Sequence, residues 1–183
     1  MRSLSTGALG VTILFMVAIG NTTAQEPEGN ADYDPEARLA ELGIELPEAA
    51  APVASYQPLV VSGNTAYVSG QLPFVDGKLV TGKLGDSVVL EQGQEAARAC
   101  GMMILAQLKA AGLLERVERV IKLGGFVASV PSFTDQPKVV NGCSDLMAEV
   151  FGDAGRHARS AVGVPVLPLD AAVEVDAIIA LKA

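Results

Sequence analysis

Two residues near the C-terminus have the side chains and the neighbours that chemistry on a small acid needs. Arg159 lies in the stretch Ala158-Arg159-Ser160-Ala161-Val162, and Glu174 lies in Val173-Glu174-Val175-Asp176. A lone guanidinium among small residues offers a planar fork that matches a carboxylate. A nearby glutamate can orient that fork and also serve as an acid or a base. The pair is therefore a candidate site for a small carboxylate.

Both residues lie in segments with the alternation of β-strands. A strand is predicted over 158–164, with Arg159 on one face. A second is predicted over 172–181, where Glu174 and the next acid share the face opposite the valines. If the two strands pair about a turn at 166–168, Arg159 comes close to Glu174. Spacing alone leaves open an ordinary cross-strand ion pair with no chemical role.

The rest of the chain must supply the frame that holds these strands. Apolar residues at helical spacing predict helices over 91–111 and 139–151. A hairpin is predicted within 60–69, a short strand over 78–81 and a long strand over 117–130. Gly124-Gly125 interrupts the long strand and predicts a bulge. Two helices on one face of a single mixed sheet make an α+β fold, and a small domain of this kind buries its other face by oligomerisation.

The N-terminus has a different character. Arg2 precedes an uncharged apolar run, and small residues lead to Ala24. This pattern predicts a cleavable signal peptide over 1–24 and a protein that is periplasmic or secreted, with no stable membrane anchor after cleavage. An uncleaved anchor is the alternative, although the run is short for a membrane span. Polar residues 25–34 predict a flexible tether, so residues 35–183 form the domain.

The domain begins with a short predicted helix. Asp34 is placed to cap it, Pro35 suits its first position, and Gly43 follows its end. Composition then narrows the classes of partner. The chain carries 13 basic and 21 acidic residues, a net charge of −8, without a basic cluster for phosphates, which argues against nucleic acid.

Cysteine and histidine give no sign of a metal centre. Cys100 and Cys143 lie apart in apolar helical patterns, where free thiols behave as small hydrophobic groups, and a disulfide between them is the minor alternative. His157 is the single histidine, and we interpret it as an exposed loop residue. Two separated cysteines and one histidine do not make a convincing ligand set, so no metal is predicted.

From about residue 52 onward the sequence resembles the RidA family, the YjgF-like reactive intermediate deaminases. The matching motifs are Tyr56, Tyr67-Val68-Ser69-Gly70-Gln71-Leu72-Pro73, Asn141, Arg159-Ser160-Ala161-Val162 with Leu167-Pro168, and Val173-Glu174-Val175-Asp176-Ala177. The segment 37–47 resembles a helix that one branch of the family adds at its N-terminus.

This resemblance implies a chorismate-mutase-like fold and a homotrimer with sites in the clefts between subunits. It also implies hydrolysis of reactive enamines and imines, such as 2-aminoacrylate, to 2-keto acids and ammonia. Arg159 would grip the substrate carboxylate, Glu174 would position or activate water, and Tyr56 would line the cleft. Ser69 and Asn141 match family positions at or beside the site. An imine carbon is already electrophilic, so neither metal nor organic cofactor is needed.

One departure from the family pattern concerns the site itself. Ala161 stands where well-known deaminases of the family carry cysteine. That family position acts largely through its backbone, so hydrolysis is compatible with alanine, whereas redox switching through the thiol is not. The alternative function is a non-catalytic module of the same fold that binds a small carboxylate or a partner protein. Ribonuclease activity, known for some relatives, fits poorly with an acidic chain.

Overall fold

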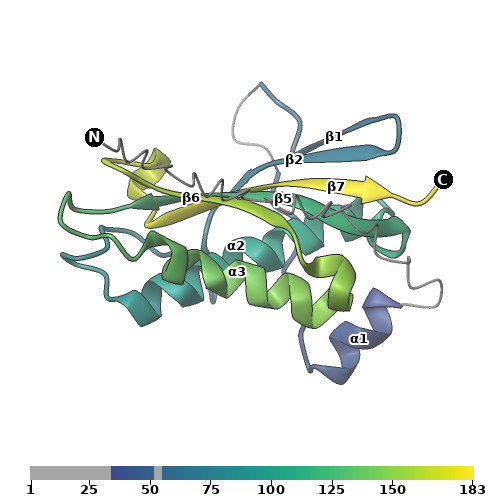
Figure 1. The fold of residues 1–183 in the computed structure, drawn as a ribbon, viewed down its shortest axis with the longest axis horizontal. Helices are drawn as coiled ribbons and strands as arrows, with labels where there is room; N and C mark the ends of the chain where they lie inside the picture. Colours follow the sequence, from purple (N-terminus) through teal and green to yellow (C-terminus); the bar gives the residue numbers. More distant parts are fainter. Residues whose placement is uncertain (1–33, 52–54) are drawn as a thin grey trace, which may run out of the picture.

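The computed structural model describes residues 34–51 and 55–183, which form a five-stranded sheet with two long helices on one of its faces (Figure 1) and a separate two-stranded sheet. The elements, in chain order, are α1 Pro35–Glu41, β1 Leu59–Ser62, β2 Thr65–Gln71, β3 Phe74–Val75, β4 Lys78–Leu79, α2 Leu90–Ala110, β5 Val117–Ala128, α3 Gln136–Phe151, β6 Ala158–Val164 and β7 Val173–Leu181. The predicted α+β layering is confirmed. The signal peptide and all but the last residue of the tether lie outside the described residues, and no described helix is long and apolar enough to cross a membrane.

Two small residues let the long helices lie close together. A side chain at Gly142 of α3 would overlap the carbonyl of Gln94 in α2, and one at Gly101 would press on Cys143. Close approach of this kind brings many atoms into van der Waals contact in a core poor in aromatic residues. Cys100 and Cys143 are fully buried free thiols in this layer, as their helical pattern predicted. Burial raises the pKa of the Cys143 thiol to about 12, so it stays protonated.

The strand order is β1-β2-β7-β5-β6, and it corrects one prediction. β6 does not pair with β7, because β5 lies between them. β5 runs parallel to β6 through the connection made by α3, and antiparallel to β7. A parallel pair needs a crossover, which the intervening helix provides. The segment after β6 is therefore a crossing from an edge to the centre of the sheet, with a short helical turn at Pro168–Asp170, and the predicted hairpin turn is wrong.

The predicted bulge at Gly124-Gly125 is also wrong. Both glycines stay in regular register with β6 and β7, and the register shifts of β5 fall earlier, within 117–122. The glycines are needed for space. A Cβ on Gly124 would overlap the carboxyl group of Asp176, and one on Gly125 would meet Val140 of α3. Each glycine thus leaves room for a side chain from a neighbouring element.

The N-terminal helix is present as predicted. Oδ1 of Asp34 accepts hydrogen bonds from the backbone N–H groups of Glu36 and Ala37, at 2.9 and 3.0 Å. The chain then runs along α2 as a strap over 44–50. Its end is held at Ala50, whose N–H contacts Sδ of Met103 at 3.5 Å and whose carbonyl accepts from the buried amide of Gln107 at 2.8 Å.

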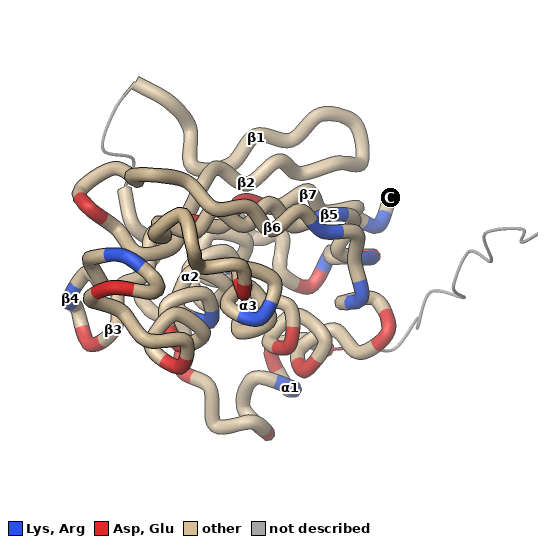
Figure 2. Tube along the Cα trace, turned by 60° about the vertical axis from the view of Figure 1, so that its left-hand side comes forward, with Lys and Arg blue, Asp and Glu red and all other residues tan. Residues whose placement is uncertain are grey.

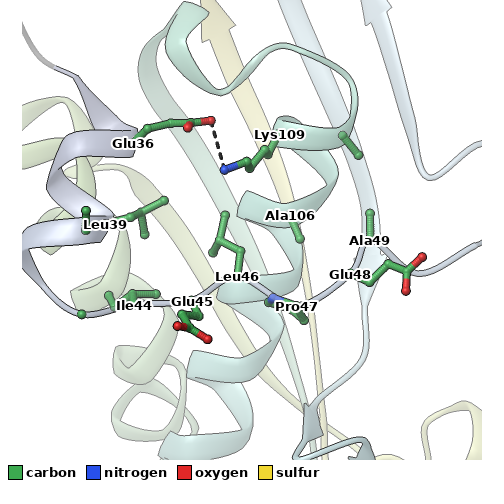
Figure 3. Close-up of a pocket in the computed structure, with 13 residues that line it drawn as sticks. Glu36, Leu39, Ile44, Glu45, Leu46, Pro47, Glu48, Ala49, Ala106 and Lys109 are labelled. Atoms are coloured by element: carbon green, nitrogen blue, oxygen red, sulfur yellow. Dashed lines mark ion pairs between the residues drawn. The ribbon is translucent and has the colours of Figure 1, made fainter.

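A cavity of about 730 Å³ lies between α1, the strap and α2 (Figure 3). Its charged groups include Glu36 and Lys109, which form an exposed ion pair at 3.2 Å. None of the residues in which the sequence predicts chemistry lines it. We therefore interpret this cavity as the seam along which α1 and the strap pack on α2.

In the described part of the chain, no helix covers the face of the sheet away from α2 and α3, and we call it the uncovered face (Figure 1). It carries large apolar side chains, of which Tyr67 is 48% exposed, Val162 44% and Ile121 41%. Apolar groups gathered on a flat face are typical of surfaces that bind another protein. This face is therefore a candidate for contact between copies of the chain.

Candidate functional site

Arg159 projects from the edge strand β6 toward α3, where three acceptors hold its guanidinium. Nη1 donates to Oδ1 of Asn141 at 2.8 Å and to Oγ of Ser144 at 2.9 Å, and Nη2 donates to the carbonyl of Pro137 at 3.2 Å. The group is half-buried. Asn141, which the family resemblance puts at or beside the site, thus contacts Arg159 directly. We call Arg159, Asn141, Ser144 and His157 the anion half-site.

These contacts leave the guanidinium with donors to spare. Arginine has five N–H groups, and the three bonds use both hydrogens of Nη1 and one of Nη2. Within the described part of the chain, the N–H of Nε and the second N–H of Nη2 have no protein acceptor. The guanidinium borders a surface cavity of about 380 Å³. Two donors on a fixed cation beside an open cavity suit a carboxylate.

His157 is not the exposed loop residue that the sequence suggested. It is half-buried, its Nδ1 lies 2.6 Å from the carbonyl of Gly155, and its Nε2 lies 3.1 Å from Oγ of Ser144. Burial lowers the pKa of its imidazole, and the charge of Arg159 lowers it further. The hydrogen bond to the carbonyl of Gly155 acts in the opposite direction, but the net lowering of the pKa favours the neutral ring.

Glu174 lies on the other face of the sheet, in the central strand β7. Its neighbours Val173 and Val175 point into the core, so alternation directs Glu174 to the uncovered face. Its carboxyl group lies over Gly70 of β2, where a Cβ would overlap it. We call Glu174, Gly70, Ser69 and Tyr56 the acid half-site.

The pKa of the Glu174 carboxyl group is raised in the folded protein. Burial raises its pKa above the usual value, and the nearby Asp176 raises it further. Burial also raises the pKa of Asp176, although the N–H of Gly124 donates to its Oδ1 at 3.0 Å. A carboxylate whose pKa is shifted toward neutrality is a better general base than an ordinary one.

Ser69 lies near the end of β2, and Tyr56 lies in the segment that precedes β1. The hydroxyl of Ser69 donates to the carbonyl of Gln57 at 2.8 Å, so it holds the backbone next to Tyr56. Tyr56 is 43% exposed and lines a cavity of about 70 Å³ with Gly70. Tyr56 and Ser69 therefore lie near Gly70, over which the carboxyl group of Glu174 lies, although Glu174 does not line this cavity, and the structure does not place them with Arg159.

The two half-sites do not meet within one chain. Arg159 pairs in register with Leu123 of β5, whereas Glu174 pairs with Phe126 of the same strand, on the opposite face. The predicted approach of Arg159 to Glu174 within a chain is thus wrong, because it depended on direct pairing of their strands. Neither do they form the cross-strand ion pair that was the alternative.

Sequence reasoning missed two members of this arrangement. Ser144 lies three residues after Asn141, which places both on one face of a helix, and this spacing was a signal that could have been used. Gly70 was quoted only as part of a motif. Its role depends on the carboxyl group of a distant strand, which no local pattern reveals.

Charge around the site is mixed. Figure 2 shows acidic residues spread over the loops and the helix layer of an acidic chain, with basic residues among them. Steering of a highly charged polyanion needs a broad basic surface. The positive charge of Arg159 is local, which suits a small anion.

Comparison with known proteins identifies the family. Residues 36–181 match the family model described as "YjgF/chorismate mutase-like, putative endoribonuclease". The chain is 55% identical over 149 residues to Protein TCP17 of Trypanosoma cruzi, covering 80% of this chain and 93% of that protein. It is 33% identical over 141 residues to a 2-iminobutanoate/2-iminopropanoate deaminase of Dermatophagoides farinae, covering 76% and 95%.

A solved structure agrees with these matches. A protein of unknown function from Agrobacterium tumefaciens is 52% identical, with a TM-score of 0.74, covering 81% of this chain and 92% of that one. The family model spans the helix layer, the sheet and both half-sites. The chain therefore belongs to the YjgF/RidA family.

Proposed function

We propose that this protein hydrolyses imines of small 2-keto acids, and the enamines that tautomerise to them, to the keto acid and ammonia. The observation that carries the proposal is the guanidinium of Arg159, which three acceptors fix in place with two N–H donors free of protein partners in the described chain. These donors would bind the carboxylate of 2-iminopropanoate or a similar substrate. The deaminase of Dermatophagoides farinae supports this substrate class.

The reaction needs one water and a group that relays its two protons to nitrogen. Ionised Glu174 takes a proton from water, whose oxygen attacks the imine carbon, and passes that proton to the imine nitrogen, which gives a carbinolamine. Glu174 then takes the hydroxyl proton and passes it to the same nitrogen as the C–N bond breaks, so the carbonyl forms and ammonia leaves. Water and imine are thereby converted to a 2-keto acid and ammonia. The raised pKa of Glu174 suits both the acceptance and the return of the proton.

Assembly is part of the proposal because the half-sites lie on opposite faces of one chain. We propose that a homotrimer brings the anion half-site of one copy against the acid half-site of the next. The apolar, uncovered sheet face supports this arrangement, since it carries Glu174 as well as exposed Tyr67. A site at a subunit boundary would also exclude bulk water from the imine.

A second candidate follows from the separation of the half-sites. In a monomer the anion half-site is complete but Glu174 lies on the opposite face of the sheet, so the protein would bind a small carboxylate without turnover. Light scattering at micromolar concentration separates the two candidates by mass. A monomer supports the binding module, and a trimer supports the hydrolase.

An amino-acid oxidase supplies the substrate for a direct test. It converts alanine to 2-iminopropanoate in the cuvette, and semicarbazide competes for the imine. The active protein should reduce semicarbazone formation and speed the release of pyruvate, and Arg159→Ala should remove both effects. If the wild-type protein changes neither rate on this or a larger 2-imino acid, the hydrolase proposal is wrong.

Export is also a proposal. Reactive enamines arise chiefly in the cytoplasm, so an exported enzyme would meet imines from another source. Mass spectrometry of the protein purified from cells tests the cleavage. Loss of residues 1–24 is the expected result, and an intact N-terminus would contradict it.

A further inference from the structure

A continuous hydrogen-bonded chain links a backbone carbonyl to the guanidinium of Arg159. It runs from the carbonyl of Gly155 to His157, then to Ser144, and ends at Nη1 of Arg159, with distances of 2.6, 3.1 and 2.9 Å. Ser144 comes from the middle of α3, Gly155 and His157 from the turn and the loop after that helix, and Arg159 from β6. Such a chain fixes side chains more firmly than separate contacts do.

The carbonyl of Gly155 determines the direction of every bond in this chain. A carbonyl can only accept, so Nδ1 of His157 carries the hydrogen. In a neutral ring Nε2 then has the lone pair, and the hydroxyl of Ser144 donates to it. The oxygen of Ser144 is left with lone pairs for Nη1 of Arg159. Each hydrogen bond in the chain therefore has a fixed donor and a fixed acceptor.

The environment of His157 keeps the ring in the form that this chain requires. The charged groups near it are Arg159 on β6, Asp145 on α3 and Arg156 beside it. Arg156 is bound to Asp153 at 3.1 Å, and Arg119 of β5 donates to the carbonyl of Arg156. Burial lowers the pKa of His157, the bond to the carbonyl of Gly155 raises it, and the charge of Arg159 lowers it, so that the net lowering favours the neutral acceptor.

We propose that Ser144 and His157 are positioning residues that lock the guanidinium of Arg159 in the orientation that receives a substrate carboxylate. This inference rests on the proposed function. Ser144 and Asn141 together use both hydrogens of Nη1, so the planar group cannot turn about its long axis. The donors that remain keep one direction, and the site selects imines that carry a carboxylate over imines that do not.

The test compares two substrates that differ by the carboxylate. One is 2-iminopropanoate, formed from alanine by an amino-acid oxidase, and the other is the imine that an amine oxidase forms from ethylamine. Ser144→Ala should raise KM for 2-iminopropanoate about tenfold, because it removes one hydrogen bond to a charged group. The value of kcat should change less than about twofold. Activity on the ethylamine product should stay unchanged.

Three further variants test whether the change in KM comes from the hydrogen-bonded chain. Ser144→Thr keeps the hydroxyl and should restore KM. His157→Phe keeps a ring of similar volume without the acceptor and should raise KM in the same direction, by about threefold. Ser132→Ala is the matched control, since Ser132 is exposed in the loop before α3. Thermal melting of each variant identifies any that fails to fold, and His157→Phe then decides the question in place of Ser144→Ala.

Pyruvate binding, measured by calorimetry, separates this inference from the proposed function. Suppose that the wild-type protein has no activity but binds pyruvate, and that Ser144→Ala weakens that binding about tenfold. The positioning role of Ser144 is then supported, and the proposed hydrolysis is refuted. Equal effects of Ser144→Ala on both imines, or an unchanged KM and pyruvate affinity, would overturn the inference. A wild-type protein that neither binds pyruvate nor turns over the imine would overturn both.

Discussion

The anion half-site and the acid half-site are built in different ways. Arg159 has three protein acceptors, and Ser144 behind it is held by a histidine whose tautomer is fixed. Glu174 is instead accommodated by free space, because its carboxyl group lies where a side chain on Gly70 would be. The first arrangement is complete in one chain. The second leaves a carboxyl group with a raised pKa on an uncovered face, which is useful only when another surface closes over it.

The largest expected effect comes from the anion half-site. Arg159→Ala should lower kcat/KM for 2-iminopropanoate about 10³-fold, since it removes a charge-assisted contact worth roughly 4 kcal/mol. Arg159→Lys keeps the charge without the planar fork and should fall between that variant and wild type. Arg156→Ala is the matched control, because its exposed guanidinium pairs with Asp153. Equal losses of kcat/KM in Arg156→Ala and Arg159→Ala would contradict the assignment of the anion half-site to Arg159.

The acid half-site should be sensitive to a single methyl group. Gly70→Ala places a Cβ where the carboxyl group of Glu174 lies, and that flexible side chain must move. A displaced base should lower kcat by roughly 30- to 100-fold with little change in KM. The melting temperature should change little, because the side chain and not the backbone gives way. Unchanged kcat would remove Gly70 from the half-site.

The pH dependence of kcat/KM tests whether Glu174 acts as the base. Activity should fall as pH drops through its raised pKa, because the protonated acid cannot accept a proton from water. Asp176→Asn removes a negative neighbour and lowers the pKa of Glu174, so the acid limb should move to lower pH. Asp153→Asn, an exposed control, should leave the limb in place. A shift in the opposite direction would exclude this role for Asp176.

The smallest effect concerns stability. The folded protein raises the pKa of Glu174, so it binds more protons than the unfolded chain between the unfolded pKa and the folded pKa. Stability therefore falls as pH rises through that window. Glu174→Gln removes this loss, and we expect it to melt slightly higher than wild type at pH 7 and at the same temperature below the window. A lower melting temperature at pH 7 would show that the carboxylate is stabilising.

The sequence predicted the local parts of this molecule well. Asp34 caps α1, the periodicity of α2 and α3 holds, and alternation assigned Arg159 and Glu174 to the correct faces of their own strands. Each of these features depends on neighbours within a few residues. The resemblance to the family added the proximity of Asn141 to Arg159.

The errors all concern contacts between distant segments. The prolines after β6 suit a hairpin as well as a crossing, so local chemistry could not show that β5 separates β6 from β7. The pair Gly124-Gly125 gives the same local signal in a bulge as in a regular strand that leaves room for Asp176 and Val140, so the sequence could not distinguish the two. The environment of His157 depends on Ser144, thirteen residues earlier, through the packing of α3 on β6.

A mixing experiment tests most directly whether the half-sites meet between copies. Arg159→Ala and Glu174→Gln should each be inactive alone. Unfolded together and refolded as a one-to-one mixture, they should regain about a quarter of wild-type activity, because in random trimers that share of boundaries joins an intact Arg159 to an intact Glu174. A mixture as inactive as the separate variants, from trimers shown to contain both, would contradict the account.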